Sequence, residues 1–344
     1  MSNGSLSIGV DLGGTNIKFG LIDATGEVVL RAKEKTGASR GDAAVVESII
    51  NGIDALLMKS RVRVEDLTSI GLGVPGTVNP GTGVVVFAPN LNWRDFELVK
   101  YLQQAFDVPF CISQDTRAAA WSEFLVGAGK GSSGVASLTL GTGIGCGMIL
   151  NGSIFHGALS TAGEFGHMIV ELNGRPCNCG RTGCLEAYAG GLAIVRDAKK
   201  SIDDISLLVQ KDTSDIGAED VFRLAFKGNV QAREITDRAV KCLGVGLVNL
   251  INLNSVEVVS LSGGISNAPD DLLLIPLMKC VQMHAYEVAA NSVRVCKSAL
   301  GEDAPMIGAG LLYRDPGSHC GCKHLEQNCD SSIPSAVSRC VQDR

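Results

Sequence analysis

Three cysteines and one histidine gather in a short glycine-rich stretch, residues 163–186. His167 is followed there by Cys177, Cys179 and Cys184. Three thiolates and an imidazole form a complete tetrahedral ligand set for zinc, and a complete protein set leaves no open position for a reactive water. The spacing therefore predicts a structural zinc site, whose use lies in the chain that it holds in place.

Two carboxylates flank this predicted zinc site. Glu164 lies just before the histidine, and Glu186 lies just after the last cysteine. A metal that fixes a loop carrying two acids and a histidine favours a preorganised pocket for a ligand rich in hydroxyl groups. The alternative is a zinc knuckle on the surface with solvated acids nearby. That alternative explains the cysteines but not the crowding of acids beside them, so we prefer the pocket.

The composition limits the class of protein. The chain has 344 residues, which is longer than one core usually supports, so we expect two lobes. An apolar share of 45% and a charged share of 19% are typical of a compact soluble protein. The net charge of -6 and the aromatic share of 5% argue against nucleic-acid binding, which needs a basic face and stacking platforms.

The sequence shows no sign of a membrane span or a secretion signal. No apolar run has the length of a span, and the first residues lack the basic-then-apolar form of a signal peptide. We therefore expect a cytoplasmic protein with no membrane partner. The twelve cysteines are then expected to be reduced thiols, three of them bound to the metal.

Two glycine tips stand about 130 residues apart, each between two apolar strands. Glycine at such a tip allows a positive φ and exposes N–H groups that can bind phosphate oxygens. The repetition predicts a duplicated α/β fold with both tips facing one cleft, and two unrelated hairpins are the alternative. The tips are Gly13-Gly14, between residues 6–11 and 17–22, and Gly141-Thr142-Gly143, between residues 135–140 and 144–150.

The rest of the chain alternates helices and strands. Gly263 and Gly264 form a third glycine turn after one of these strands. Helices are expected over residues 42–59, 117–126, 191–201, 218–227, 230–252, 272–284 and 306–313, and strands near 27–32, 69–74, 109–113, 256–260 and 292–296. Beyond Asp315 the periodicity ends. The cysteines and histidines there could bind a second metal, but the composition favours a disordered cysteine-rich tail over residues 317–344.

Three polar residues stand at the ends of expected elements. Asp115 precedes a helix, where an acid either caps the helix or acts as a general base. Asp11 ends the first strand beside a glycine tip, where it either forms the turn or meets a magnesium ion carried by a nucleotide. Asn90 either forms a turn or hydrogen-bonds a ligand. Local spacing leaves each pair of alternatives open.

These motifs together resemble the ROK family of sugar kinases, and most of all its ATP-dependent glucokinases. The resemblance spans roughly residues 6–313 and follows the family's order of motifs: DLGGTNIK, GVPG, PNLNW, QDTRAAA, GTGIGCG, EFGH, CNCGRTGCLE and SGGIS. The histidine followed by the cysteine cluster and Leu-Glu is the most specific of these motifs. The glycine tips belong to the wider hexokinase and actin superfamily.

The resemblance implies a duplicated ribonuclease H-like fold of two α/β lobes with an interlobe cleft. The small lobe would comprise residues 1–118 and about 304–316, and the large lobe residues 119–303 with the zinc site. A dimer is the family's usual form, so the resemblance implies a homodimer or a higher homo-oligomer for this chain.

The resemblance also implies the roles of the site residues. Asp115 would be the catalytic base that takes the proton from the sugar's primary hydroxyl. His167 would bind zinc with one ring nitrogen and face the sugar with the other. The sugar would be bound by Asn90, Gln114, Asp115, Glu164, His167 and Glu186. Mg-ATP would be bound by Asp11, Gly13, Gly14, Thr15, Asn16, Lys18, Gly141, Thr142, Gly143, Gly263 and Gly264, with Asp11 organising the magnesium ion.

The expected activity is phosphorylation of the 6-hydroxyl of a hexose by ATP, with glucose favoured by the run CLEAYAGG. Kinases for N-acetylglucosamine, N-acetylmannosamine or fructose are alternatives, as are ADP or polyphosphate as phosphoryl donors. A sugar-sensing regulator is disfavoured, because a first strand at Leu6 leaves no room for an N-terminal helix-turn-helix. Gln114 and Arg117 stand where the family frequently has asparagine, which opens the choice of sugar.

Overall fold

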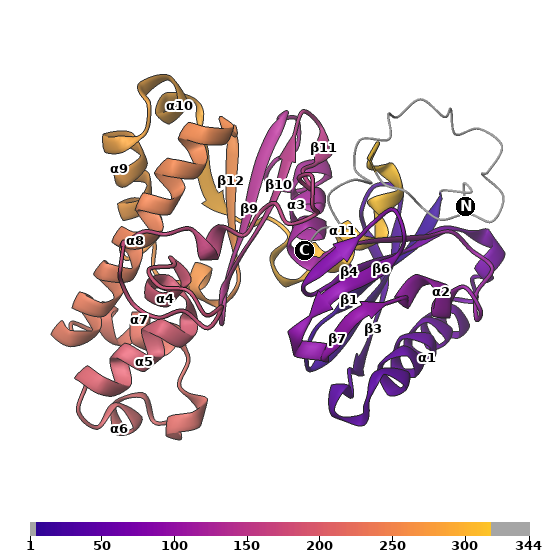
Figure 1. Cartoon of the computed structure of the whole chain (residues 1–344), viewed down its shortest axis with the longest axis horizontal. Coiled ribbons are helices and arrows are strands. Elements are labelled where there is room, and N and C mark those ends of the chain that lie inside the picture. Colours follow the sequence, from indigo (N-terminus) through magenta and orange to yellow (C-terminus); the bar gives the residue numbers. More distant parts are fainter. Residues whose placement is uncertain (1–4, 318–344) are drawn as a thin grey trace, which may run out of the picture.

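The structure is a computed structural model that describes residues 5–317. Two five-stranded sheets form the centres of two lobes (Figure 1). The first sheet has the order β3 (Val28–Lys35), β2 (Asn16–Asp23), β1 (Leu6–Leu12), β4 (Leu67–Val74), β8 (Phe110–Gln114). The second has the order β11 (Ser153–Ile154), β10 (Ile144–Leu150), β9 (Gly134–Leu140), β12 (Val258–Ser262), β13 (Arg294–Lys297).

The two sheets share one plan. In each, three antiparallel strands joined in sequence are followed by two strands parallel to the first. This order is the duplication that the two glycine tips predict, and the ends of the expected strands lie within three residues of the observed ones. The fold class is therefore confirmed at the level of topology.

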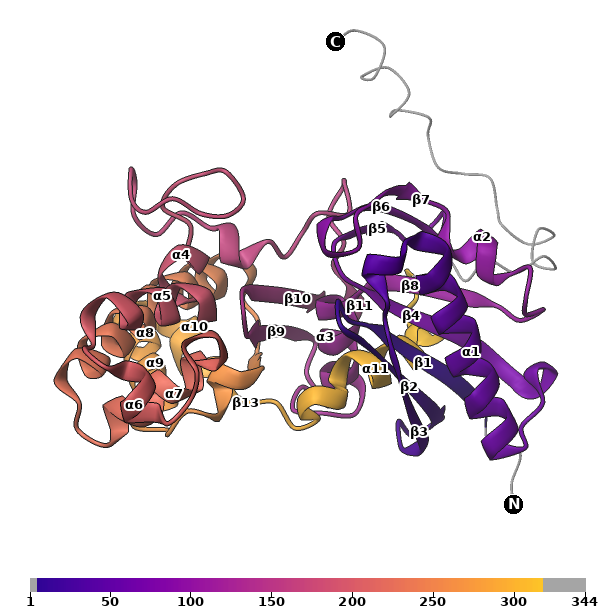
Figure 2. The same cartoon turned by 90° about the horizontal axis from the view of Figure 1, so that it is seen from below.

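Two helices pack between the sheets (Figure 2). They are α3 (Asp115–Leu125), which contacts β9 and β10, and α11 (Ala304–Gly310), which contacts β1 and β4. The two helices also contact each other, and a Cβ on Gly308 would lie 1.7 Å from the carbonyl oxygen of Ala118. An apolar cluster that includes Trp121, Ile149 and Ile307 joins the two lobes here.

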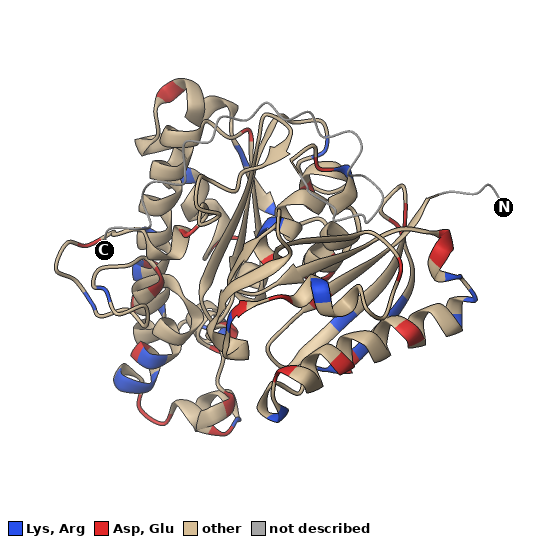
Figure 3. Cartoon of the chain, turned by 45° about the vertical axis from the view of Figure 1, so that its right-hand side comes forward, with Lys and Arg blue, Asp and Glu red and all other residues tan. Residues whose placement is uncertain are grey.

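Further helices cover the outer faces. In the small lobe α1 (Asp42–Ser60) buries Val45, Ile49, Ile53 and Leu56, which are the apolar positions that predict it. The large lobe carries α4 (Glu186–Ala189), α5 (Gly191–Ser201), α6 (Ile205–Val209), α7 (Ala218–Phe226), α8 (Val230–Asn254), α9 (Leu274–His284) and α10 (Glu287–Ser292). Figure 3 shows acidic and basic residues interspersed along the outer helices of the side in view.

A small third sheet was not predicted from the sequence. It consists of β5 (Thr77–Asn79), β6 (Val84–Ala88) and β7 (Trp93–Phe96), and the short helix α2 (Leu98–Leu102) follows it. These strands are short and are interrupted by turn residues, so their periodicity is weak. This sheet carries the turn with Asn90.

Two expectations about the chain need comment. The expectation that every thiol is reduced is wrong at Cys111, which is disulfide-bonded, whereas the other seven cysteines of the described part are free. The predicted lobe boundary at residue 118 falls inside α3 and stays a prediction. The expected disordered tail and its alternative metal site lie outside the described residues, apart from Gly317. Within the described part, every helix is too short or too polar to span a membrane.

Candidate active site

The carboxyl ends of three parallel strands bring two aspartates to one edge of the first sheet. Asp11 of β1 lies opposite Gly73 of β4, and Gly73 lies opposite Ser113 of β8. Asp115 follows two residues later as the first residue of α3. A Cβ on Gly73 would lie 3.6 Å from the Cα of Asp115, so the helix begins close against the sheet. The strand register thus places the predicted base beside the predicted magnesium-organising acid.

The two carboxyl groups hold protons more tightly than usual. Burial, and to a lesser extent the nearby charge of Asp11, raises the pKa of Asp115 to about 7. The Thr116 N–H, which donates to Asp115 Oδ1 at 2.7 Å, lowers this pKa but does not offset the burial. Burial also raises the pKa of Asp11 to about 6, against the charge of Lys18, which lowers it. A carboxylate with a pKa near neutrality is suited to general-base catalysis.

The first glycine tip is held by hydrogen bonds of its own backbone. The Gly13 N–H donates to the Asn16 oxygen at 3.1 Å, and the Thr36 hydroxyl donates to the Gly13 oxygen at 2.6 Å. Gly14 and Thr15 are exposed at the tip. The expected positive φ is wrong for both glycines. Glycine at position 13 instead permits a close approach, because a Cβ there would lie 2.7 Å from the Asn16 oxygen.

Lys18 and an acid that the sequence analysis missed flank Asp11. The Lys18 ammonium donates to the backbone oxygen and the carboxylate of Glu302 at 3.1 and 3.3 Å. The next residue, Asp303, raises the pKa of Asp11 by its charge and pairs with Arg31 at 2.9 Å. The available signal for Asp303 was an acid three residues before the helix expected over residues 306–313. A third carboxylate therefore lies near the proposed magnesium position.

The second glycine tip is joined to the cysteine-rich loop by Glu186. Its Oε2 accepts a hydrogen bond from the Ile144 N–H at 2.9 Å. A Cβ on Gly143 would lie 2.3 Å from the same oxygen, so only glycine leaves room for this contact. The carbonyl groups of Gly141 and Thr142 accept hydrogen bonds from the start of α5, and Thr142 itself is exposed. One carboxylate oxygen of Glu186 is thus engaged with the protein.

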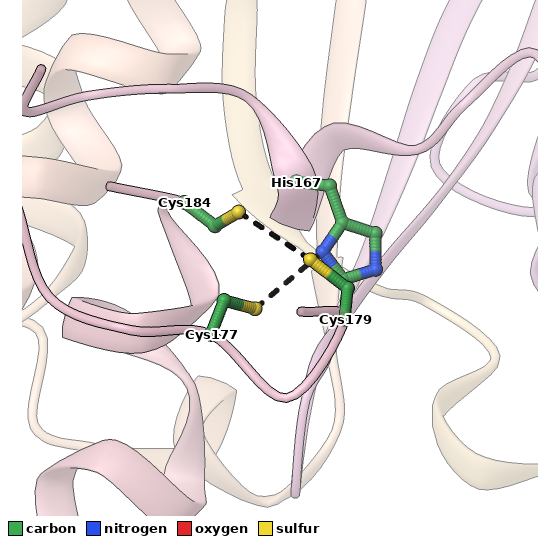
Figure 4. Close-up of side chains that lie close together, drawn as sticks. All are labelled: His167, Cys177, Cys179 and Cys184. Carbon is green, nitrogen blue, oxygen red and sulfur yellow. Dashed lines mark hydrogen bonds between the residues drawn. The ribbon is translucent and has the colours of Figure 1, made fainter. Parts of the chain in front are cut away.

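The four predicted zinc ligands come together (Figure 4). One ligand atom each from His167, Cys177, Cys179 and Cys184 lies within 4.8 Å of all the others. The Cys177 sulfur lies 3.8 Å from His167 Nδ1, and the Cys179 sulfur lies 3.7 Å from the Cys184 sulfur. Zinc–sulfur bonds of about 2.3 Å at a tetrahedral angle separate two sulfur atoms by about 3.8 Å. The donor set therefore fits a tetrahedral ion.

His167 connects this cluster to Glu164. Its Nδ1 faces the cysteine sulfur atoms, and its Nε2 lies 3.9 Å from Glu164 Oε2. Glu164 precedes the short 3-10 turn Phe165–His167, and its side chain is 49% exposed. One ring nitrogen thus faces the metal position and the other faces an acid that is open to a ligand.

The remaining predicted sugar ligands lie on the small-lobe side. Gln114 ends β8 and is adjacent to Asp115. Asn90 is exposed in the turn Pro89–Leu91 of the third sheet, whose strand β5 contacts β8. The predicted sugar ligands therefore come from both lobes, with Glu164, His167 and Glu186 on the other side.

The third glycine turn follows β12. Gly263 has a left-handed φ of 85°, and its carbonyl accepts a hydrogen bond from the Ser266 hydroxyl at 2.6 Å. Gly264 lies against Glu219 of α7, because a Cβ on Gly264 would lie 1.7 Å from Glu219 Oε1. Glu219 was missed by the sequence analysis, since no local pattern links it to this turn.

Comparison with known proteins identifies the family. The ROK family matches residues 7–316. A glucokinase from Halalkalibacterium halodurans is 35% identical over 312 residues, covering 89% of this chain and 94% of the relative. The crystal structure of a ROK family glucokinase from Streptomyces griseus in complex with glucose and AMPPNP matches with a TM-score of 0.76 and 31% identity, covering 90% of this chain and 99% of that one. A xylose repressor from Bacillus subtilis is 28% identical, and the match covers 90% of this chain and 77% of the repressor. The chain belongs to the ROK family, and its two lobes have the actin/hexokinase-like fold of that family's sugar kinases.

Proposed function

We propose that the protein is a hexose kinase that transfers the γ-phosphoryl group of Mg-ATP to the 6-hydroxyl of glucose. The similarity to glucokinases over almost the whole chain supports this reaction class. The structural observation that most supports the kinase reaction is that Asp115, with a pKa of about 7, lies beside Asp11 at the edge of the first sheet. A kinase needs such a base next to the group that organises magnesium.

In this proposal Asp115 accepts the proton of the sugar hydroxyl while the hydroxyl oxygen attacks the γ-phosphorus in line. The bond between the γ-phosphorus and the β–γ bridging oxygen breaks, and its electron pair leaves with ADP. Phosphoryl transfer depends mainly on alignment and charge stabilisation, so a positioned carboxylate and well-placed N–H groups suffice. The exposed tips with Gly14 and Thr142 would supply these N–H groups, and Asp11 would organise the magnesium ion through water.

The sugar side of the site consists of Asn90, Gln114, Glu164, His167 and Glu186 in this proposal. We also assign a structural zinc ion to the cysteine cluster, on the basis of its donor set and spacing. The ion would take no part in phosphoryl transfer, because all four of its positions would be filled by protein. It would hold His167 so that Nε2 faces the sugar together with Glu164.

The choice of sugar and donor is the finer part of the proposal. Glucose and ATP are preferred because a related ROK glucokinase was crystallised with glucose and an ATP analogue. The N-acetylhexosamines and fructose are the alternative substrates, and polyphosphate and ADP the alternative donors. A homodimeric, cytoplasmic protein stays a prediction, and size-exclusion chromatography with light scattering tests the dimer.

A coupled assay tests the reaction class and the substrate together. Glucose, mannose, fructose, N-acetylglucosamine and N-acetylmannosamine are each offered with ATP, and the preferred sugar is then offered with ADP and polyphosphate. We expect kcat/KM to be highest for glucose with ATP. Turnover of an N-acetylhexosamine in preference to glucose would favour the alternative kinase, and binding of sugar without turnover of any would favour a sensing role.

A further inference from the structure

Arg117 is an arginine enclosed behind the candidate sugar site. It is the third residue of α3, two residues after Asp115, and only 1% of it is exposed. Burial of a guanidinium is unfavourable unless partners compensate its charge. A cation in the first turn of a helix is also unfavourable, because the N-terminal end carries partial positive charge. An arginine at this position therefore calls for a specific role.

One side of the guanidinium holds a segment of the large lobe. Nη2 donates to the carbonyl oxygens of Ser160 and Ala162, at 2.9 and 2.7 Å. Ser160 has a left-handed φ of 54°, a conformation that is strained for a residue with a side chain. Gly163, three residues after Ser160, has a φ of 92°, and Glu164 follows it directly. Arg117 thus stabilises a strained turn that leads straight into Glu164.

The other side of the guanidinium has hydrogen-bonding capacity to spare. Nε and Nη1 are buried and make no hydrogen bond within the described part of the chain. The charged or titratable groups that act on Arg117 are Glu164 first, then the Cys146 thiol and Asp115. Burial raises the pKa of Cys146 to about 12, so this thiol is neutral at physiological pH. The counter-charges of Arg117 are therefore the two carboxylates proposed to act on the sugar.

We propose that Arg117 is a positioning residue for sugar binding, acting through Glu164. It fixes the turn at Ser160 and Ala162, which leads directly into Glu164, and its buried charge attracts the Glu164 carboxylate. Glu164 is half exposed, and among the described residues its carboxylate has one ion-pair contact, to His167 at 3.9 Å. The fixed turn and the nearby cation therefore favour the orientation in which Glu164 would accept hydrogen bonds from sugar hydroxyls. This inference rests on the proposed function, because only there is Glu164 a sugar ligand.

A double-mutant cycle tests the inference. The variants are Arg117→Met, which removes the charge, Glu164→Gln, and the pair together, with Arg117→Lys as the variant that keeps the charge. Glucose affinity is measured by calorimetry as well as by KM, so the result does not depend on turnover. Arg314→Met is the matched control, because Arg314 also donates to a backbone carbonyl, that of Ala24 at 3.2 Å, and lies outside the site.

We expect Arg117→Met to weaken glucose binding about tenfold or more, the loss of one charge-assisted contact. In the Glu164→Gln background the same change should weaken it less than about twofold, since coupled residues are non-additive. Arg117→Lys should recover part of the loss, and the KM for ATP and the Arg314→Met control should stay within about twofold of the wild type.

Two results overturn the inference. One is normal glucose affinity in a folded Arg117→Met variant whose melting temperature alone is lower, which means a packing role. The other is an equal loss in both backgrounds, which means that Arg117 does not act through Glu164. If Arg117→Met does not fold, Arg117→Lys and Arg117→Gln carry the same cycle. Failure of the proposed function gives a different result, because the wild type itself then shows no turnover of glucose, whatever residue stands at position 117.

Discussion

The two sides of the candidate site are held in place by different means. Asp115 stands where a parallel strand passes into a helix, and the register of β1, β4 and β8 sets its position. The loop with Glu164 and His167 belongs to no sheet of the described part and is held by short turns, a few backbone hydrogen bonds and the isolated bridges Ile169–Cys184 and Pro176–Thr182. Its four predicted zinc ligands lie within 4.8 Å of one another, and the proposed ion would tie them together.

Because of this difference, we expect substitutions on the two sides of the site to affect different properties of the protein. On the Asp115 side the backbone fixes the position, so a side-chain change there should alter the reaction and leave the fold intact. On the loop side the proposed zinc ligands would supply much of the support, so a change there should alter sugar binding and stability together. The four predictions below test this contrast.

The largest expected effect is that of Asp115→Asn. Loss of the general base should lower kcat by about 10²–10⁴-fold in the coupled assay. The melting temperature should stay the same or rise, because the amide has no charge to bury. Near-normal turnover in the purified variant would mean that another group is the base.

Loss of the metal cluster should have the next largest effect. If the proposed zinc ion supports His167, its removal with a chelator, or Cys184→Ser, should raise the KM for glucose by about 10–100-fold and lower the melting temperature. The KM for ATP should change much less. Cys280→Ser is the matched control, a free cysteine on α9 outside the cluster. Unchanged glucose affinity in a folded, metal-free sample would contradict the role of the cluster.

Gly143→Ala tests the contact between the second glycine tip and Glu186 of the cysteine-rich loop. The new Cβ would lie 2.3 Å from Glu186 Oε2 and would break the hydrogen bond to the Ile144 N–H. We expect kcat/KM to fall about tenfold, the value of one charge-assisted hydrogen bond. Gly134→Ala is the control, because its Cβ would meet only ordinary contacts, the nearest at 3.5 Å. Equal effects of the two substitutions would show that Glu186 is not positioned by the tip.

The smallest effect is a shift along the pH axis. Since Asp115 must be ionised to act and its pKa is about 7, kcat/KM should rise with pH through that region. The pKa of Asp115 in the folded protein lies above the ordinary aspartate value of 3.8, so the ionised carboxyl destabilises the fold, increasingly from pH 4 to 7. Asp115→Asn should therefore gain stability over the wild type across this range. A stability difference that is constant with pH would contradict the raised pKa.

The sequence predicted the parts of the site whose signals are local. The strands around both glycine tips, the helix from Asp42 to Ser60 and the His167 cluster all follow from spacing that a short window contains. The sequence placed Asp115 at a strand–helix junction, but it could not decide whether this residue caps the helix or acts as a general base. That choice depends on Asp11, which only the sheet register brings near.

What the sequence could not show depends on residues far apart in the chain. Lys18 binds Glu302, Arg31 binds Asp303, and Glu186 binds the Ile144 N–H. Burial of Arg117 is likewise a tertiary property, since its sequence neighbours look like those of any helix start. The small third sheet was missed because its strands are too short for their alternation to stand out.

The contact between Gly308 and Ala118 has a mechanical consequence. Main chain meets main chain there, with no side chain between that could compress, so the two central helices cannot approach each other more closely. Any closing of the two lobes around a substrate must then be a rotation of one lobe relative to the other about the contact between these helices. A methyl group added at position 308 would push the two central helices apart and hold the two lobes at a wider angle. It would do so without contacting any proposed ligand-binding residue.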